Sequence, residues 1–279
     1  MTTTDPADPA ALAAAALRGA RALVVTAGAG MGVDSGLPDF RGPEGFWNAY
    51  PPYRRLGLTF EEAANPEHFE GDPAFGWGFY GHRAALYRAT VPHQGFALLR
   101  RWIERLGLEP FVVTSNVDGQ FQRAGFDPAR IVEIHGSIHH LQCTGPCRGD
   151  IWENAEEVPV DEATMRAARV PACPRCGAPS RPNILMFGDF AWLPERTMAQ
   201  RERFAGFLGR LGGAPLVVVE LGAGTALPSI RMLTQELGAR PGALAVRINP
   251  REPQIPPPHL SLRAGALDGL AAIDRALGE

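Results

Sequence analysis

Three glycines that follow a short apolar run near the N-terminus constrain the fold of this chain most strongly. The run covers residues 22–25, and Gly28, Gly30 and Gly32 come soon after it. Such a run predicts a buried parallel strand, and glycines after a strand allow backbone N–H groups to approach a phosphate closely. The spacing matches the dinucleotide motif G-x-G-x-x-G only in part, because Val33 occupies the third glycine position. The alternative is a tight turn that binds nothing.

The loop at residues 34–41 favours a ligand site over a plain turn. It reads Asp-Ser-Gly-Leu-Pro-Asp-Phe-Arg, so a carboxylate, an aromatic ring and a guanidinium follow one another in a backbone restricted by glycine and proline. Loops that are both polar and constrained usually carry function. We therefore expect a nucleotide to bind at this end of the first strand.

Length and charge narrow the class of protein. With 279 residues and 45% hydrophobic content, the chain can bury a full core, in one large domain or in a large and a small one. A net charge of −3 gives no bulk attraction to nucleic acid or to anionic membranes. The apolar segment at residues 9–17 lacks a preceding basic region, which predicts a first helix ending at Gly19 rather than a signal peptide. We expect a cytoplasmic protein with no direct nucleic-acid or membrane partner.

Further apolar runs predict strands that end in polar or small residues. These runs are residues 111–114, 131–134, 216–221 and 243–248, followed by Ser115, His135, Gly222 and Asn249 respectively. Residues 183–189 predict another strand, and residues 94–107 predict a helix that ends at Gly107. Strands alternating with helices predict an α/β fold with a parallel, doubly wound, Rossmann-like sheet, which binds ligands at the carboxyl ends of its strands. A lone histidine at such a strand end is otherwise more often structural than catalytic.

All the cysteines lie in one segment. Cys143 and Cys147 form one pair, and Cys173 and Cys176 form a second. Their spacing predicts four thiolate ligands for one tetrahedral, structural Zn²⁺ ion. A full set of protein ligands leaves no position for water, so we expect the metal to take no part in chemistry. Disulfides are the alternative, and they are less suited to a cytoplasmic chain.

Residues 43–91 form a segment of different character. It is rich in aromatic residues and interrupted by proline and glycine, which is typical of a helical insertion whose rings pack a core of their own. Within it, the apolar spacing of residues 75–89 predicts a helix that places Tyr80 and Arg83 one turn apart.

The glycine loop, together with residues 35–42, resembles the first signature of the sirtuins, a family of NAD-dependent protein-lysine deacylases. Other family signatures follow in the same order, from about Ala20 to Leu270. Residues 115–118 are similar to the family's Gln-Asn-Ile-Asp, with Ser115 in place of glutamine. Residues 187–189 are similar to Phe-Gly-Glu, with a shorter acid at Asp189. Residues 222–224 stand where the family usually shows Gly-Thr-Ser.

The resemblance implies NAD as a consumed co-substrate, structural zinc, and a set of site residues. The implied catalytic residues are His135 as general base and Asn116, which positions the ribose or a water. The implied cofactor-binding residues are Gly28, Ala29, Gly30, Asp39, Phe40, Arg41, Ser115, Asn116, Asp118, Gly222, Ala223, Gly224, Asn249, Ala266 and Leu267. The implied substrate-binding residues are Tyr80, Arg83, Met186, Phe187, Gly188 and Leu227.

Tyr80 and Arg83 resemble the Tyr-x-x-Arg element by which some sirtuins recognise acidic acyl chains such as succinyl or malonyl. A guanidinium can hold a carboxylate bidentately, and a tyrosine hydroxyl can add a third hydrogen bond. The alternative is that Arg83 is a solvated helix residue and Tyr80 a core aromatic.

The implied reaction removes acetyl or acidic acyl groups from lysines of acylated proteins or peptides, giving nicotinamide, O-acyl-ADP-ribose and free lysine. Two other functions stay open: a protein ADP-ribosyltransferase and a non-catalytic NAD-sensing module. We expect residues 1–42, 92–140 and 183–279 to form the NAD-binding domain. The insertion at 43–91 and a zinc module at 141–182 would form a smaller domain.

Overall fold

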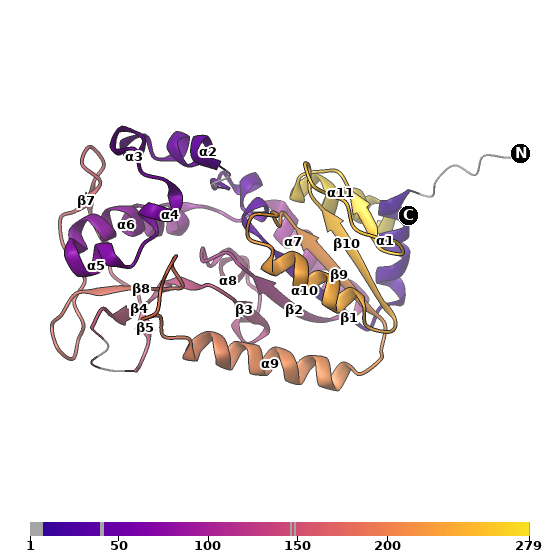
Figure 1. Ribbon diagram of the computed structural model, residues 1–279. Helices are drawn as coiled ribbons and strands as arrows, with labels where there is room; N and C mark the ends of the chain where they lie inside the picture. The colour runs from indigo at the N-terminus through magenta and orange to yellow at the C-terminus, as the bar shows by residue number, and fades with distance from the viewer. Residues whose placement is uncertain (1–7, 40–41, 146, 148, 279) are drawn as a thin grey trace, which may run out of the picture.

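The computed structural model describes residues 8–39, 42–145, 147 and 149–278. Across these ranges, the larger lobe is built on a six-stranded parallel sheet with strand order β11-β10-β9-β1-β2-β3 (Figure 1). The strands are β1 (Ala22–Ala27), β2 (Glu109–Thr114), β3 (Ile131–Glu133), β9 (Leu216–Leu221), β10 (Ala243–Ile248) and β11 (Leu260–Leu262). The chain order reverses between β1 and β9, the point at which open α/β sheets bind their ligands. The predicted doubly wound sheet is confirmed.

The three central strands end level with one another. Ala27, the last residue of β1, is paired in register with Leu221 on β9 and with Thr114 on β2. Both β1 and β9 are buried along their whole length, as expected of parallel strands covered on both faces. The loops that follow these three strands therefore leave the sheet side by side.

Helices cover both faces of the sheet. The helices α1 (Pro9–Gly19), α7 (Gln94–Leu106) and α11 (Ala266–Gly278) pack on one face, together with the short α8 (Gln120–Arg123). The helices α9 (Glu195–Leu211) and α10 (Ser229–Gly238) pack on the other. The first helix begins and ends as predicted, because the Asp8 side chain accepts the N–H of Ala10 and Gly19 is its last residue. Short 3₁₀ turns η1 (Ala29–Met31), η2 (Val33–Ser35) and η3 (Pro128–Arg130) connect the elements.

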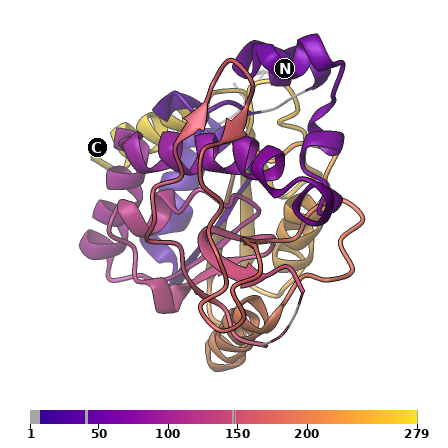
Figure 2. The ribbon, with the colours of Figure 1, turned by 90° about the vertical axis from the view of Figure 1, so that its left-hand side faces the viewer.

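The smaller lobe has a separate core made mainly of aromatic residues. Its helices are α2 (Gly42–Ala49), α3 (Pro51–Leu56), α4 (Phe60–Ala63), α5 (Glu67–Gly71) and α6 (Pro73–Ala89). Its strands are β4 (Gly136–Cys143), β5 (Trp152–Glu153) and β8 (Ser180–Ile184), with a hairpin of β6 (Val160–Asp161) and β7 (Arg166–Ala167) that lies across α6 (Figure 2). How the two lobes divide into domains along the chain stays a prediction.

The strand predicted over residues 183–189 is shorter and lies in a different sheet. The strand β8 ends at Ile184 and pairs antiparallel with β4 in the small lobe. Beyond Ile184 the N–H of Leu185 donates to the His135 carbonyl oxygen, and Gly188 turns the chain with a φ of 67°. The Leu185 bond continues the alignment of β8 with the chain before β4 by one residue, and the turn at Gly188 then redirects the chain, so residues 185–189 form a loop. In the described ranges, no helix combines the length and apolar character needed to cross a membrane.

Candidate active site

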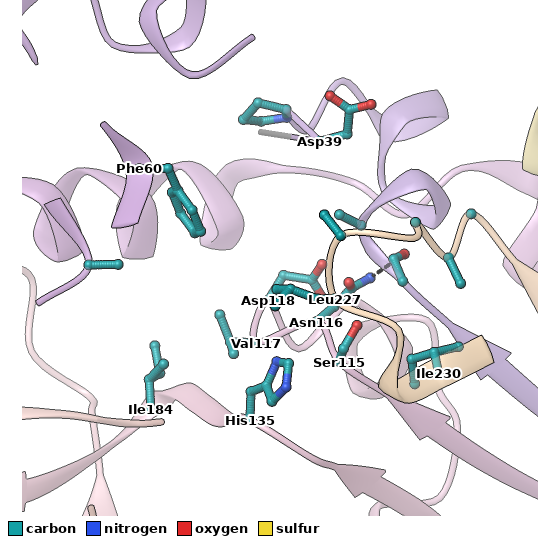
Figure 3. Close-up of a pocket in the computed structure, with 18 of the residues that line it drawn as sticks. Asp39, Phe60, Ser115, Asn116, Val117, Asp118, His135, Ile184, Leu227 and Ile230 are labelled. Carbon is teal, nitrogen blue, oxygen red and sulfur yellow. Dashed lines mark hydrogen bonds between the residues drawn. The ribbon is translucent and has the colours of Figure 1, made fainter. Parts of the chain in front are cut away.

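A cavity of about 750 Å³ opens between the lobes, beside the carboxyl ends of β1, β2 and β9. Figure 3 shows His135 and Ser115 on one side of it and Phe60 and Asp39 on the opposite side. Most of the predicted site residues line this cavity. They are Gly28, Ala29, Asp39, Tyr80, Arg83, Ser115, Asn116, Asp118, His135, Met186, Phe187, Gly222, Ala223, Gly224 and Leu227.

Other predicted residues do not line the cavity. Asn249 is fully buried; its Nδ2 donates to the Ala223 carbonyl oxygen at 2.9 Å, and its Oδ1 accepts the N–H groups of Arg251 and Glu252. It therefore ties the loop after β9 to the loop after β10. The remaining members of this group are Gly30, Gly188, Ala266 and Leu267. The predicted contacts Phe40 and Arg41 lie outside the described residues.

The glycine loop packs directly against the loop after β9. The N–H groups of Gly28 and Gly30 donate to the carbonyl oxygens of Leu221 and Gly222, at 2.9 and 3.1 Å. A Cβ atom on Gly30 would lie 2.7 Å from the Gly222 Cα, closer than side chains approach a backbone. The sequence suggested that such N–H groups face a phosphate. In the structure these two are used to hold the loops together, and the missing side chains let the backbones meet.

His135 lies just beyond β3, at the start of the turn into β4. Burial lowers the pKa of its imidazole, and a hydrogen bond to the Ser115 backbone partly opposes that shift. The next residue, Gly136, has a φ of 79°, and a Cβ atom there would collide with the Asn183 carbonyl oxygen. The imidazole is therefore held at the cavity wall in a form that can accept a proton near neutral pH.

Asn116 and Asp118 leave β2 in a tight, well-bonded loop. The Asn116 N–H donates to the Thr114 hydroxyl oxygen at 3.0 Å. The Asn116 Nδ2 donates to the Gly28 carbonyl oxygen, also at 3.0 Å, and Figure 3 draws this bond as a dashed line. The Asp118 carboxylate accepts the N–H of Gln120 at 2.9 Å. Burial raises the pKa of Asp118 to about 6, against an ordinary value of 3.8. A carboxylate that is buried where its charged form is disfavoured is typical of a functional site.

Arg83 is buried in an aromatic part of the cavity. Its guanidinium carbon lies 5.0 Å from the Phe79 ring centre and 5.6 Å from that of Tyr80, which is also buried. Cation–π contacts of this kind are stronger away from water. Arg83 is 6% exposed, so the alternative of a solvated helix residue is wrong.

The loop after β8 is held by Asp189. The Asp189 carboxylate forms a buried ion pair with Arg181 and accepts the N–H groups of Met186 and Ala191. An aspartate side chain is short enough to accept hydrogen bonds from backbone N–H groups on both sides of its own turn. This bonding fixes the segment in which Leu185 and Phe187 face the cavity.

Comparison with known proteins identifies the family. The sequence model of the Sir2 family matches residues 28–204. The chain belongs to the Sir2 family, the sirtuins. It is 33% identical, over 88% of each chain, to "NAD-dependent protein deacylase 1" of Archaeoglobus fulgidus. It is 30% identical to an NAD-dependent protein deacylase of Aeropyrum pernix, over 94% of this chain and 95% of that one.

Solved structures have the same fold as this sirtuin. A mutant Sir2 homologue in complex with ADP-ribose aligns with a TM-score of 0.69 and 26% identity, covering 95% of each chain. A Sir2 homologue in complex with NAD aligns with a TM-score of 0.68 and 26% identity, covering 95% of this chain and 92% of that one.

Sequence reasoning missed several residues that line the sirtuin cavity. Tyr87 follows Arg83 by one helical turn, so helical spacing could have identified it. The Thr225 hydroxyl donates to the Glu252 carboxylate at 2.8 Å, and both residues line the cavity. Leu37, Pro38 and Val117 lie within the loop and the signature that the sequence indicated, although they were not named as site residues. No sequence signal singles out the remaining ones, which are Phe60, Glu61, Ala64, Ile184, Leu185, Ala226 and Ile230.

The four cysteines of this sirtuin form a cluster away from the cavity. Their sulfur atoms all lie within 4.8 Å of one another, and all four are free thiols. The Cys143–Cys176 and Cys147–Cys173 sulfur pairs are each 3.7 Å apart. A zinc tetrahedron with Zn–S bonds of about 2.3 Å has sulfur–sulfur edges of about 3.8 Å. The cluster therefore fits one structural zinc ion rather than two disulfides.

Proposed function

We propose that this NAD-dependent protein deacylase performs its reaction in the cavity between the lobes, with His135 as general base. The observation that carries the proposal is that His135, Asn116 and Arg83 line one cavity at the switch point of the sheet. The location agrees with the rule for ligand sites in doubly wound sheets. The role proposed for each residue is supported by its place in the family's motifs and by the burial and hydrogen bonds of its side chain.

NAD fits the end of the cavity that the glycine loops enclose. The backbones of residues 28–29 and 222–224 line it without bulky side chains, and its volume lies within the range of ordinary ligand pockets. Asn116 would position the nicotinamide ribose, and the Asp118 carboxylate would accept a hydrogen bond from the nicotinamide amide. NAD supplies the electrophilic ribose carbon to which the acyl oxygen becomes attached as nicotinamide leaves.

His135 is suited to accept a proton in that reaction. Burial lowers its pKa, so the neutral imidazole predominates at pH 7. His135 would accept the proton of a ribose hydroxyl of NAD, which would make that oxygen a better nucleophile toward the acyl carbon.

None of these 279 residues can supply the acyl-lysine. The 27 basic residues counted as lysine plus arginine are all arginine, so these 279 residues contain no lysine to deacylate. We infer that an acylated protein or peptide chain enters beside the loop at 185–189. Its acyl group would extend toward Tyr80 and Arg83, which also line the cavity.

An acidic acyl group suits Arg83 better than an acetyl group does. A succinyl or malonyl carboxylate at this end of the cavity would accept charge-assisted hydrogen bonds from the Arg83 guanidinium, which an acetyl group cannot do. The aromatic rings around Arg83 exclude water and so strengthen that interaction.

Mass spectrometry of the NAD products, across a panel of acyl-lysine peptides, tests the proposal. We expect nicotinamide and O-acyl-ADP-ribose only when an acylated peptide is present. His135→Ala should lower kcat/KM by about 10²- to 10⁴-fold and leave NAD affinity within about tenfold. His68→Ala, on α5 and outside the cavity lining, serves as the control. ADP-ribose attached to a protein side chain would instead identify a transferase, and near-parental turnover by His135→Ala would refute the assigned base.

A further inference from the structure

The strand β3 lies at an edge of the parallel sheet and ends two residues before His135. Its inner side pairs with β2, where Glu133 stands opposite Thr114. The outward-facing N–H and C=O groups of an edge strand have no strand partner, and such groups need hydrogen bonds when they are buried. Glu133 is 1% exposed, so its outward groups need partners from another part of the chain.

The helix α9 supplies these partners, because it lies alongside β3 (Figure 1). Gln200 Oε1 accepts the Glu133 N–H at 3.0 Å, and the Thr197 hydroxyl donates to the Glu133 carbonyl oxygen, also at 3.0 Å. Arg196 Nη2 donates to the Glu133 carboxylate at 2.5 Å. Thr197 and Gln200 are themselves buried, so water does not compete for these bonds. The backbone of Glu133 is therefore fixed by β2 on one side and by α9 on the other.

His135 is held between two anchored points of the backbone. On one side is Glu133, whose Cα lies at most about 7 Å from that of His135. On the other side, the His135 carbonyl oxygen accepts the N–H of Leu185 at 2.9 Å. A catalytic group that is displaced by about 1 Å can lose about 10²-fold in rate. A shift of β3 away from α9 would therefore move the base out of the position that the reaction requires.

We propose that Thr197 and Gln200 are positioning residues for the base: by bonding to the backbone of Glu133, they hold His135 at the cavity wall. This inference rests on the proposed function, in which His135 accepts a proton after nicotinamide has left. Neither Thr197 nor Gln200 lines the cavity, so neither would contact NAD or the acylated peptide. Their loss should therefore impair the step that uses the base and spare the step before it.

Two assays separate these steps. Exchange of isotope-labelled nicotinamide into NAD, in the presence of an acylated peptide, measures the departure and return of nicotinamide, whereas formation of the deacylated peptide measures the complete reaction. Thr197→Val keeps the shape of the side chain and removes the hydroxyl; we expect kcat for deacylation to fall at least about tenfold, with exchange within about twofold of the parent. Gln200→Met, which removes the acceptor, should have the same effect. Thr197→Ser, which retains the donor, should keep deacylation near the parental rate.

The controls distinguish positioning from a general loss of stability, with all rates measured below the unfolding temperature of each variant. Thr234→Val removes another buried hydroxyl on the same face of the sheet, one that donates to the Ile230 carbonyl oxygen at 3.0 Å. It should lower the unfolding temperature comparably and leave the ratio of deacylation to exchange unchanged. His135→Ala should retain exchange and lose deacylation, which marks the full effect.

Three results would overturn the inference: unchanged deacylation by Thr197→Val, equal falls in its two rates, or an equally large loss in Thr197→Ser. A parent that catalyses neither exchange nor deacylation, or a His135→Ala variant with parental deacylation, would instead refute the proposed function.

Discussion

Arg83 donates two hydrogen bonds to the hydroxyl oxygen of Tyr87, from Nε at 3.0 Å and from Nη2 at 2.7 Å. The two residues are one turn apart on α6, and both line the cavity. The contact fixes the plane of the guanidinium while its charge remains at the cavity wall. Tyr87 thus positions the group that we propose to bind an acidic acyl chain.

Arg83→Met should change the acyl preference of the enzyme. Loss of the guanidinium would leave a succinyl carboxylate unpaired, which costs about 2 to 5 kcal/mol in transition-state binding. The effect is measured as kcat/KM for the succinyl peptide divided by kcat/KM for the acetyl peptide. Tyr87→Phe should lower this ratio less than Arg83→Met does. Arg88→Met is the control, since Arg88 bonds to the carbonyl oxygens of Asn154 and Glu156 instead. Equal losses on both peptides, or a parental preference for acetyl, would show that Arg83 is structural.

Asp118→Asn should stabilise the fold and impair the reaction. The pKa of Asp118 is raised to about 6 by burial, so the folded state binds this proton more tightly than the unfolded chain. The free energy of unfolding therefore falls as pH rises from about 4 to about 6, and the full loss, on the order of 2–3 kcal/mol, persists above pH 6. The asparagine variant lacks this titration.

Denaturant unfolding at pH 4.5 and pH 7.5 measures this effect of Asp118. We expect the advantage of Asp118→Asn to appear mainly at the higher pH, with a reduced kcat/KM for NAD. Asp268→Asn, at an exposed acid in the first turn of α11, should show neither change. A variant less stable than the parent at pH 7.5 would contradict the assigned cost of burial.

The cysteine cluster should bind one zinc ion per chain. Cys173→Ala removes a ligand, so we expect loss of zinc and unfolding of the small lobe, because structural zinc contributes folding free energy directly. Elemental analysis and circular dichroism measure the two effects, and restoring zinc to chelator-treated parent should restore both structure and activity. Fully active, zinc-free parent protein would rule out the structural role.

Gly30→Ala should weaken NAD binding through the backbone. The new Cβ would lie 2.7 Å from the Gly222 Cα, so the loops after β1 and β9 must move apart. We expect the KM for NAD to rise by at least about tenfold, given how strongly misplacement of a binding loop affects a reaction. Gly19→Ala is the matched control, because nothing lies within 4 Å of its Cβ and α1 should gain stability. An unchanged KM for NAD in Gly30→Ala would contradict the close packing of these loops.

Local pattern was sufficient to identify the family, the parallel sheet and the cysteine cluster. The glycine loop, the polar residues after β2 and the cysteine pairs are short signatures, in which residue type and spacing already specify the chemistry. Strand ends were also predictable, because a buried parallel strand reads as an apolar run that stops at a glycine or a polar residue. The residues at those ends, including Asn116 and His135, do line the cavity.

Contacts between distant segments were decided only by folding. Asn249 ends a predicted strand, but it does not line the cavity. Its side-chain amide donates to the Ala223 carbonyl oxygen instead, because buried polar groups of neighbouring loops need hydrogen-bond partners. The Phe60 ring packs against the Phe187 ring, and no pattern within residues 43–91 indicates this contact. The strand β8 joins β4 instead of the parallel sheet, because partner choice depends on which edge is near in space. Spacing along the chain specifies which side chains share an element, whereas packing between elements determines which of them meet.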